Sequence, residues 1–162
     1  MDITAIDLTK SSIAYAMRAA EEYGCGNITF AQADIMALDA LNEKFDFIEC
    51  SGVLHHLADP SAGWKQLINK LNDGGLMLIS LYSARVREVI TAVRLEAKKY
   101  SPDPKGIRSL RSYIKSLPED HPLKPISRRR DFYAMSDIRD LVFHVQETTF
   151  TLPEIKKIAA VR

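Results

Sequence analysis

Two carboxylates and a pair of histidines are the residues of this sequence whose types and spacing could do chemistry. Asp7 ends the segment ITAID, and Asp34 follows the segment NITFAQA. A carboxylate at the end of a strand that precedes a helix can accept hydrogen bonds from both hydroxyls of a ribose. A carboxylate followed by an aliphatic residue, as in Asp34-Ile35, can hold an adenine by its exocyclic amine. Each aspartate could equally cap the element that follows it, but the two together favour an adenosine-containing ligand more than either does singly.

The histidines, His55 and His56, lie in the segment FDFIECSGVLHHLADP, residues 45–60. Adjacent side chains point to opposite faces of a strand and diverge by about 100° around a helix. The pair therefore does not readily share a metal ion, and since His121 and His144 lie in other segments we expect no metal site. One imidazole could act as a general base, because imidazole titrates near neutrality. Alternatively, one ring packs on the sheet while the other forms hydrogen bonds in the loop.

The elements that position these residues alternate between strands and helices. Alternation of this kind predicts a parallel sheet with right-handed crossovers, in which ligands bind beyond the carboxyl ends of the strands. Asp7, Asp34, Ser51-Gly52 and Tyr82 all fall at such ends. The predicted strands are residues 3–7, 27–33, 45–51 and 76–82; the predicted helices are residues 8–24, capped by Thr9 or Ser11, and the segment that begins at Asp59-Pro60 and ends at Gly74-Gly75.

After Ser83 the strand pattern stops and the sequence becomes mostly helical. The helices expected there are residues 84–100, 107–117 and 136–145, the last capped by Ser136, and a final helix opened by Thr151 and Pro153. The predicted fold class is therefore α/β: a parallel sheet of about four strands with flanking helices, followed by a helical C-terminal region. We place the boundary between a core of residues 1–83 and a helical region of residues 84–162.

The net charge of +1 conceals an uneven distribution. Residues 1–84 carry 5 basic and 11 acidic side chains, whereas residues 85–130 carry 13 basic and 5 acidic ones. The basic block could attract an anionic partner, or it could be a solvated helical face. Cys25 and Cys50 form no CxxC motif, so a zinc ribbon is excluded and two reduced thiols are expected. Because no apolar run is long enough to span a membrane and no signal peptide is recognisable, we expect a soluble cytoplasmic protein.

Four segments resemble the class I S-adenosylmethionine-dependent methyltransferases. They are TAIDLT, ITFAQADIMAL, FDFIECSGVLHHLADP and LNDGGLMLISLYS, in this order and spacing, over roughly residues 3–83. The back half resembles the lid and C-terminal region of a bacterial subgroup that is often joined to helical repeat domains. The resemblance implies a Rossmann-like fold, S-adenosyl-L-methionine as cofactor and an unidentified methyl acceptor.

The resemblance also implies roles for individual residues. Asp7 would bind the ribose hydroxyls with Leu8 against the adenine, and Asp34 and Ile35 would hold the adenine itself. Ser51 and Gly52 would line the cofactor near its sulfonium. His55 and His56 would be the catalytic residues, where the acceptor and the methyl group meet, with Tyr82 across the pocket.

The sequence departs from the family at its start. The family opens with a strand and a glycine-rich turn, whereas here no glycine precedes Gly24. We therefore expect a piece of a larger multidomain chain, with methyl transfer by the full-length parent and weak or no cofactor binding by this chain. Without the first strand, residues 3–7 either pair directly with residues 47–51 or leave a gap in the sheet, with unpaired backbone groups.

Two other functions compete with methyl transfer. A nicotinamide-dependent oxidoreductase shares the acidic residue at the strand end, but the sequence carries no glycine fingerprint for it. A non-catalytic interaction module would use the basic helices to bind an acidic partner. No surface that interleaves aromatic and basic residues points to nucleic acid.

Overall fold

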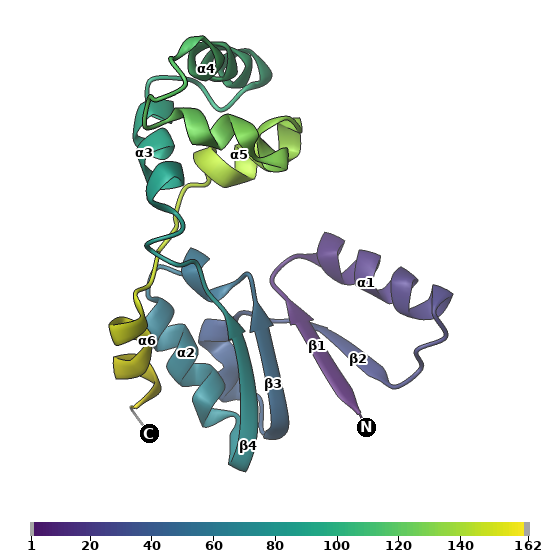
Figure 1. Ribbon diagram of the computed structural model, residues 1–162. Helices are drawn as coiled ribbons and strands as arrows, with labels where there is room; N and C mark the ends of the chain where they lie inside the picture. The colour runs from purple at the N-terminus through teal and green to yellow at the C-terminus, as the bar shows by residue number, and fades with distance from the viewer. Residues whose placement is uncertain (1, 161–162) are drawn as a thin grey trace. The chain divides into compact units, whose positions relative to one another are not determined.

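The computed structural model describes residues 2–160, which fold as two compact units (Figure 1). The first unit comprises the chain up to Cys50 together with Asp59–Ile79. The second comprises Ser51–Ala58 together with the chain from Ser80 onward. The chain therefore passes between the units three times, after Cys50, after Ala58 and after Ile79.

The first unit begins with a strand–helix–strand motif. Strand β1 (Ile3–Asp7) pairs in parallel with β2 (Ile28–Gln32), in a register that runs from Ile3 opposite Ile28 to Asp7 opposite Gln32. Helix α1 (Lys10–Glu22) connects the two strands, and the Thr9 hydroxyl caps it by accepting a hydrogen bond from the Ser12 amide at 3.3 Å. Parallel pairing with a helical crossover places the carboxyl ends of both strands at one edge.

A second pair of strands, β3 (Phe45–Ser51) and β4 (Leu71–Ser80), flanks helix α2 (Pro60–Asn69). Asp59 caps α2 by accepting from the Ala62 amide at 3.0 Å, and Pro60 takes the first helical turn, as the sequence predicts. The apolar side of α2 is buried, with Trp64 and Leu67 at most 7% exposed. Leu38 of the short 3-10 helix Ile35–Ala40, which packs on α2, is also buried.

The predicted class, α/β with parallel strands, flanking helices and a helical C-terminal region, is confirmed. The single sheet of four strands is not: in the described part of the chain β1 pairs with β2 and β3 pairs with β4, as two separate sheets. Of the two arrangements that the sequence leaves open, the structure therefore has the gap. In the part of the chain that the structure describes, β1 and β3 each pair with another strand along one edge only.

The start of the last strand corrects a second prediction. Helix α2 ends at Asn69, and Gly74-Gly75, predicted to stop that helix, lies inside β4. The strand pairing begins earlier, because the Phe45 amide donates to the carbonyl of Lys70 at 2.8 Å.

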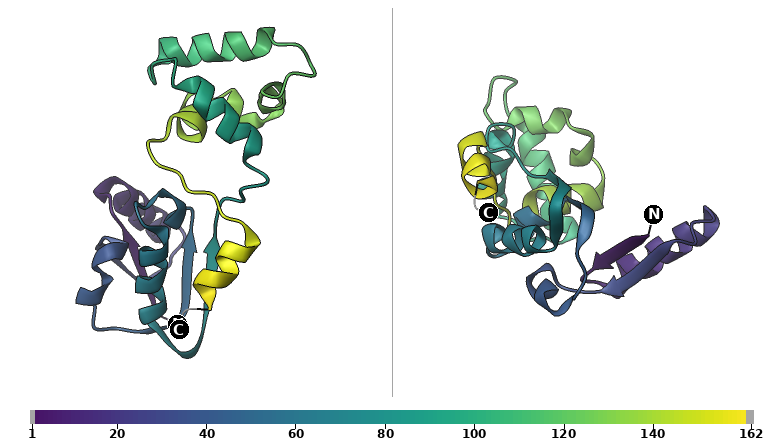
Figure 2. Two further views of the ribbon diagram at one scale, coloured as in Figure 1. Left: turned by 90° about the vertical axis from the view of Figure 1, so that its left-hand side faces the viewer. Right: turned by 90° about the horizontal axis from the view of Figure 1, so that it is seen from below.

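The second unit is mainly helical. Its core is formed where α3 (Glu88–Ala97), α4 (Pro104–Ser116) and α5 (Met135–Phe143) come together, as two views of the molecule show (Figure 2). The core also takes in residues of the 3-10 helices Lys124–Arg128 and Arg130–Phe132. A final helix, α6 (Leu152–Ala159), is opened by Thr151, whose amide donates to the Glu154 carboxylate at 2.7 Å. The fully buried side chains of this core are Val93, Ile107, Leu110, Ile114, Ile126, Phe132 and Ile138.

Three helix starts in this unit differ from the sequence predictions. Helix α4 begins at Pro104 rather than at residue 107, because Asp103 caps it by accepting from the Gly106 amide at 2.7 Å. Helix α3 begins at Glu88 rather than at residue 84, because residues 84–87 form a turn. Helix α5 begins at Met135, with Ala134 as its N-cap, and the Ser136 hydroxyl donates to the neighbouring Asp137 carboxylate instead of capping the helix. Within residues 2–160, no helix combines the length and the apolar character that crossing a membrane would need.

Candidate functional site

The two predicted cofactor-binding aspartates lie at one edge of the first unit. Asp7 is the last residue of β1, and its carbonyl accepts from the Ala33 amide at 3.1 Å. Asp34 directly follows Ala33. The parallel pairing of β1 with β2 therefore brings the carboxylates of Asp7 and Asp34 to one edge, at the carboxyl ends of the two strands. In the described part of the chain, neither carboxylate takes part in an ion pair.

Asp7 is fixed by the start of α1. The amide and the hydroxyl of Thr9 both donate to Asp7 Oδ1, at 2.7 and 2.9 Å. These bonds favour the ionised form, so the pKa of Asp7 lies below its usual value, first because of the backbone bond and then because of the hydroxyl. Leu8 beside it is 64% exposed, and its carbonyl accepts from the Gln32 amide group at 2.9 Å.

Asp34 is fixed in a similar way. Its Oδ1 accepts from the Met36 amide at 2.8 Å and caps the 3-10 helix that follows, while its side chain is exposed. Ile35, the next residue, is half-buried. Asp7 therefore holds Thr9, the N-cap of α1, and Asp34 is itself the cap of its 3-10 helix; each uses Oδ1 for this, and the two carboxylates lie at one edge.

Ser51 and Gly52 belong to the second unit, at the end of β3. The Ser51 hydroxyl lies 3.2 Å from the hydroxyl of Ser80, the last residue of β4. Gly52 has a φ of +77°, a left-handed conformation that strains any residue with a side chain, although a Cβ there would have open space. The chain thus turns sharply at Gly52 towards the histidine pair.

The two predicted catalytic histidines lie in different environments, although their ring centroids are only 4.3 Å apart. His55 is 1% exposed, and its imidazole stacks on the ring of Tyr82 with 3.6 Å between centroids. The Arg87 guanidinium lies 3.5 Å from the centroid of the same Tyr82 ring. Two groups this close to one centroid must occupy opposite faces, so Tyr82 lies between His55 and Arg87.

Arg87 is itself held by Glu147. The guanidinium donates two hydrogen bonds to the carboxylate, Nε to Oε1 at 2.7 Å and Nη2 to Oε2 at 2.6 Å. The side chains are 9% and 3% exposed, so this is a buried bidentate ion pair. Arg94 approaches the same carboxylate at 3.5 Å and donates to the His144 carbonyl at 2.6 Å.

Burial, and after it repulsion of a proton by the neighbouring His56 and Arg87, lowers the pKa of His55 to about 4. Glu147 opposes the shift, and His144 adds to it. Both ring nitrogens of His55 are buried without a hydrogen-bond partner. His55 is therefore a neutral ring at neutral pH and packs as an aromatic side chain.

His56 occupies a more polar position. Its Nδ1 lies 3.0 Å from the carbonyl of Gln146, and its ring lies against that of His144 with 3.9 Å between centroids. His144 lies in a different segment of the sequence, so nothing in the sequence groups it with the pair, but the fold brings its ring to that of His56. Within residues 2–160, no group of three or more histidine, cysteine, aspartate or glutamate side chains could hold a metal ion.

Sequence reasoning missed Arg87, Gln146 and Glu147. Arg87 belongs to the basic block, for which the sequence leaves open an anionic partner or a solvated helical face, yet it is 7% exposed. Lys124 of the same block is 9% exposed and donates to the carbonyls of Lys115 and Leu117. Part of the basic charge is therefore buried inside the second unit instead of facing solvent. No local pattern signals these residues, because Arg87 and Glu147 are 60 positions apart.

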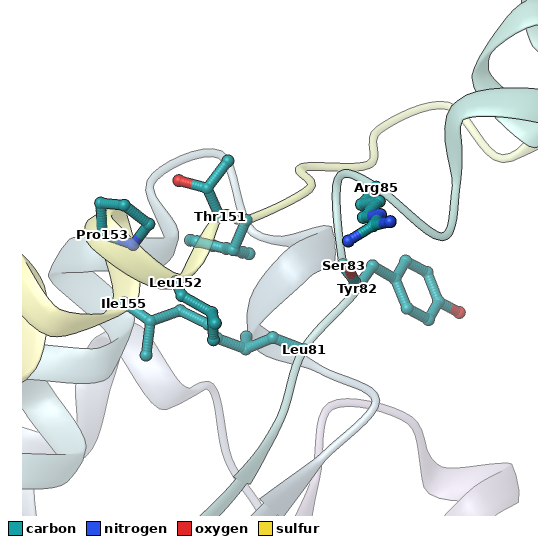
Figure 3. Close-up of a pocket in the computed structure, with 9 residues that line it drawn as sticks. Leu81, Tyr82, Ser83, Arg85, Thr151, Leu152, Pro153 and Ile155 are labelled. Atoms are coloured by element: carbon teal, nitrogen blue, oxygen red, sulfur yellow. The ribbon is translucent and has the colours of Figure 1, made fainter.

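An apolar pocket of about 340 Å³ lies where the chain leaves β4 and enters α6 (Figure 3). An isolated parallel bridge joins Ser83 and Phe150 there, and the Phe150 amide donates to the Tyr82 carbonyl at 2.7 Å. Figure 3 shows Leu152 and Ile155 lying together on one side, with the Tyr82 ring pointing away from them. The pocket is therefore lined mainly by apolar groups. The ring of Tyr82 points away from them and stacks on His55.

Comparisons with known proteins agree on one family. A family model described as a methyltransferase domain matches residues 1–137. An uncharacterised protein of a Synechococcus species is 29% identical over 167 residues, which cover 96% of this chain and 40% of that protein. The chain thus spans less than half the length of this relative. The comparisons give no support to an oxidoreductase or to a non-catalytic interaction module.

Two solved structures share the fold. The structure of PKMT2 from Rickettsia typhi in complex with AdoHcy has a TM-score of 0.76 at 20% identity, covering 97% of this chain and 33% of that chain. The YcgJ protein from Bacillus subtilis has a TM-score of 0.51 at 16% identity, covering 96% of this chain and 71% of that chain. At these identities the likeness concerns the arrangement of the backbone.

Proposed function

Because the chain belongs to the class I S-adenosylmethionine-dependent methyltransferases, we propose that the edge carrying Asp7 and Asp34 holds the adenosine of S-adenosyl-L-methionine. Asp7 accepts hydrogen bonds from the ribose hydroxyls. Asp34 accepts from the adenine amine, and Leu8 and Ile35 contact the adenine ring. The position of the two carboxylates at the same ends of the parallel strands β1 and β2 carries this proposal.

The donor and acceptor chemistry of this edge fits adenosine. Asp7 uses Oδ1 for Thr9, and its other carboxylate oxygen is the acceptor that we assign to the ribose. Its lowered pKa keeps the group ionised at neutral pH, and an ionised acceptor forms the stronger hydrogen bonds. The exposed side chain of Leu8 offers the apolar surface that a purine ring requires.

S-adenosylmethionine supplies an electrophilic methyl group when it is bound. For Ser51 and Gly52 we keep the prediction that they line the cofactor near its sulfonium, and for His55 and His56 that they lie where the acceptor binds. Gly52 supports this by letting the chain turn without a side chain. Cys25 and Cys50 are reduced cysteines that form no disulfide, which fits a reducing compartment, and we propose the cytoplasm as the location of the protein.

The test compares cofactor affinity in Asp7→Asn and in a matched control. Asparagine keeps an oxygen for the Thr9 bonds, and so preserves the cap of α1, but replaces the second acceptor with a donor. We expect Asp7→Asn to weaken binding of S-adenosylhomocysteine at least about tenfold, since a hydrogen bond to a charged group is worth about 1.5–3 kcal/mol. Binding is measured by titration with ligand up to the millimolar range.

The control is Asp59→Asn, which makes the same change at the cap of α2. It should leave the affinity unchanged. Equal affinities for the wild type, Asp7→Asn and Asp59→Asn would contradict the role of Asp7.

A further inference from the structure

We propose that His56 is the proton acceptor for the methyl acceptor, that His55 is not, and that Gln146 positions His56 for this task. The inference rests on the proposed methyl-transfer function and assigns different roles to two histidines that the sequence treats alike. It is carried by the hydrogen bonds that join residues 144–148 to the turn at residues 54–57.

His55 cannot serve as the base where it lies. It is 1% exposed, and its ring is stacked on Tyr82. A general base must reach within hydrogen-bond distance of the proton that it removes. Since both ring nitrogens of His55 are enclosed by the fold, an acceptor cannot reach them without unfolding the turn.

His56 carries its lone pair on the other nitrogen, Nε2. The carbonyl oxygen of Gln146 can only accept a hydrogen bond, so the 3.0 Å contact requires that His56 Nδ1 carries the proton. In a neutral imidazole with a protonated Nδ1, Nε2 is the basic atom. The Gln146 carbonyl therefore selects the tautomer that can take up a proton.

Gln146 is anchored by its own side chain. Its amide group donates to the carbonyl of Leu57, directly after His56, at 2.6 Å. The Thr148 amide donates to the carbonyl of His55 at 2.8 Å. These two bonds hold the 146–148 segment against the turn on both sides of the imidazole contact, so the position of the Gln146 carbonyl depends on the glutamine side chain.

The titratable rings packed around His56 are those of His55, His144 and Tyr82. The rings of His55 and His144 lie 4.3 and 3.9 Å from that of His56, centroid to centroid, and Tyr82 lies at 5.8 Å. The one carboxylate of this cluster, Glu147, is already paired with Arg87. His144 Nδ1 lies 2.7 Å from the Gln146 carbonyl and 3.3 Å from the Gln146 amide nitrogen, which can donate to it.

The chemistry limits the acceptor to a nucleophile that loses a proton, such as an N–H or O–H group. As the nucleophile forms its bond to the methyl carbon, the carbon–sulfur bond breaks and its electron pair returns to sulfur. The proton of the nucleophile passes to His56 Nε2, and solvent later removes it. Atoms and charge balance without another reactant.

The tautomer is read by nitrogen NMR of the full chain labelled with ¹⁵N-histidine, without any ligand. We expect His56 to give the signature of a protonated Nδ1 and an unprotonated Nε2. Gln146→Leu should convert this to a mixture of tautomers, because the anchor to Leu57 is lost. Gln66→Leu, which removes a glutamine that donates to Asp39 in the first unit, should leave the spectrum of His56 unchanged.

Access is read by modification with diethyl pyrocarbonate at neutral pH, located by mass spectrometry. Carbethoxylation should occur at His56 and be at least about tenfold slower at His55. A protonated Nε2 on His56, a spectrum unaltered by Gln146→Leu, or faster modification of His55 would each overturn the inference. None of these readouts uses the cofactor, so a failure of S-adenosylhomocysteine to bind is a separate result that contradicts only the proposed function.

Discussion

Replacement of His55 by phenylalanine should flatten the pH dependence of stability. The folded protein holds the pKa of His55 at about 4, mainly because the ring is buried, whereas an ordinary histidine titrates near 6.5. Below pH 6.5 the unfolded chain takes up a proton at this position and the folded chain does not. The stabilisation is therefore complete above pH 6.5 and is lost as the pH falls towards 4.

The size of the effect follows from the two pKa values. A tenfold difference in proton affinity is about 1.4 kcal/mol, so the interval from 6.5 to about 4 corresponds to about 3 kcal/mol. Phenylalanine keeps an aromatic ring against Tyr82 and cannot be protonated. The acids with lowered pKa values, Asp7, Asp103, Glu119 and Glu154, lose their contribution mainly below this interval and are common to both proteins.

The assay is urea unfolding followed by circular dichroism at pH 7.0, 6.0, 5.0 and 4.5. The wild type should lose about 2–3 kcal/mol more stability over this interval than His55→Phe does. The control His121→Gln removes a half-buried histidine elsewhere in the second unit and should retain the wild-type slope. Identical slopes for the wild type and His55→Phe would refute the burial of a neutral His55.

Two further predictions concern the second unit. Glu147→Gln leaves the guanidinium of Arg87 buried beside a neutral amide and should cost about 3–5 kcal/mol in urea unfolding; Asp131→Asn, at the exposed ion pair with Arg129, should cost nothing measurable. Gly106→Ala should destabilise the protein by about 1–3 kcal/mol in the same assay, although alanine is the better helix former by about 1 kcal/mol, because its Cβ would lie 2.1 Å from the Ser101 carbonyl oxygen.

Opposite outcomes would contradict these two structural claims. An unfolding free energy for Glu147→Gln equal to that of the wild type would show that the ion pair is not buried. A stabilised Gly106→Ala would show that Ser101 does not crowd this position. Gly26→Ala is the control for the second variant, because an added Cβ there meets no atom within 4 Å.

The elements that local chemistry determines were predictable. The bounds of β3 agree with the apolar run Phe45–Ser51, and Asp59-Pro60 opens α2 as a cap and first-turn proline should. The common edge of Asp7 and Asp34 also followed from the sequence, because the carboxyl ends of adjacent parallel strands lie together.

The histidine cluster was not predictable, because its contacts are long-range. His56 and Gln146 are 90 positions apart, and Arg87 and Glu147 are 60 positions apart. Burial of Arg87 depends on a carboxylate supplied by the loop after α5, and no period or spacing in the sequence links the two. The predicted start of β4 is wrong for a related reason. The backbone hydrogen bond from the Phe45 amide to the Lys70 carbonyl begins the strand pairing before Gly74-Gly75, a pair of residues that usually indicates a turn.

The central claim is that the edge at Asp7 and Asp34 binds adenosine, and chemical-shift mapping tests it most directly. S-adenosylhomocysteine is added, up to millimolar concentration, to the ¹⁵N-labelled chain while its backbone amides are recorded. The account predicts that the largest shifts fall on Leu8, Thr9, Ile35 and Met36, next to the two carboxylates. Largest shifts on the basic helix α4, with these four amides unmoved, would contradict it.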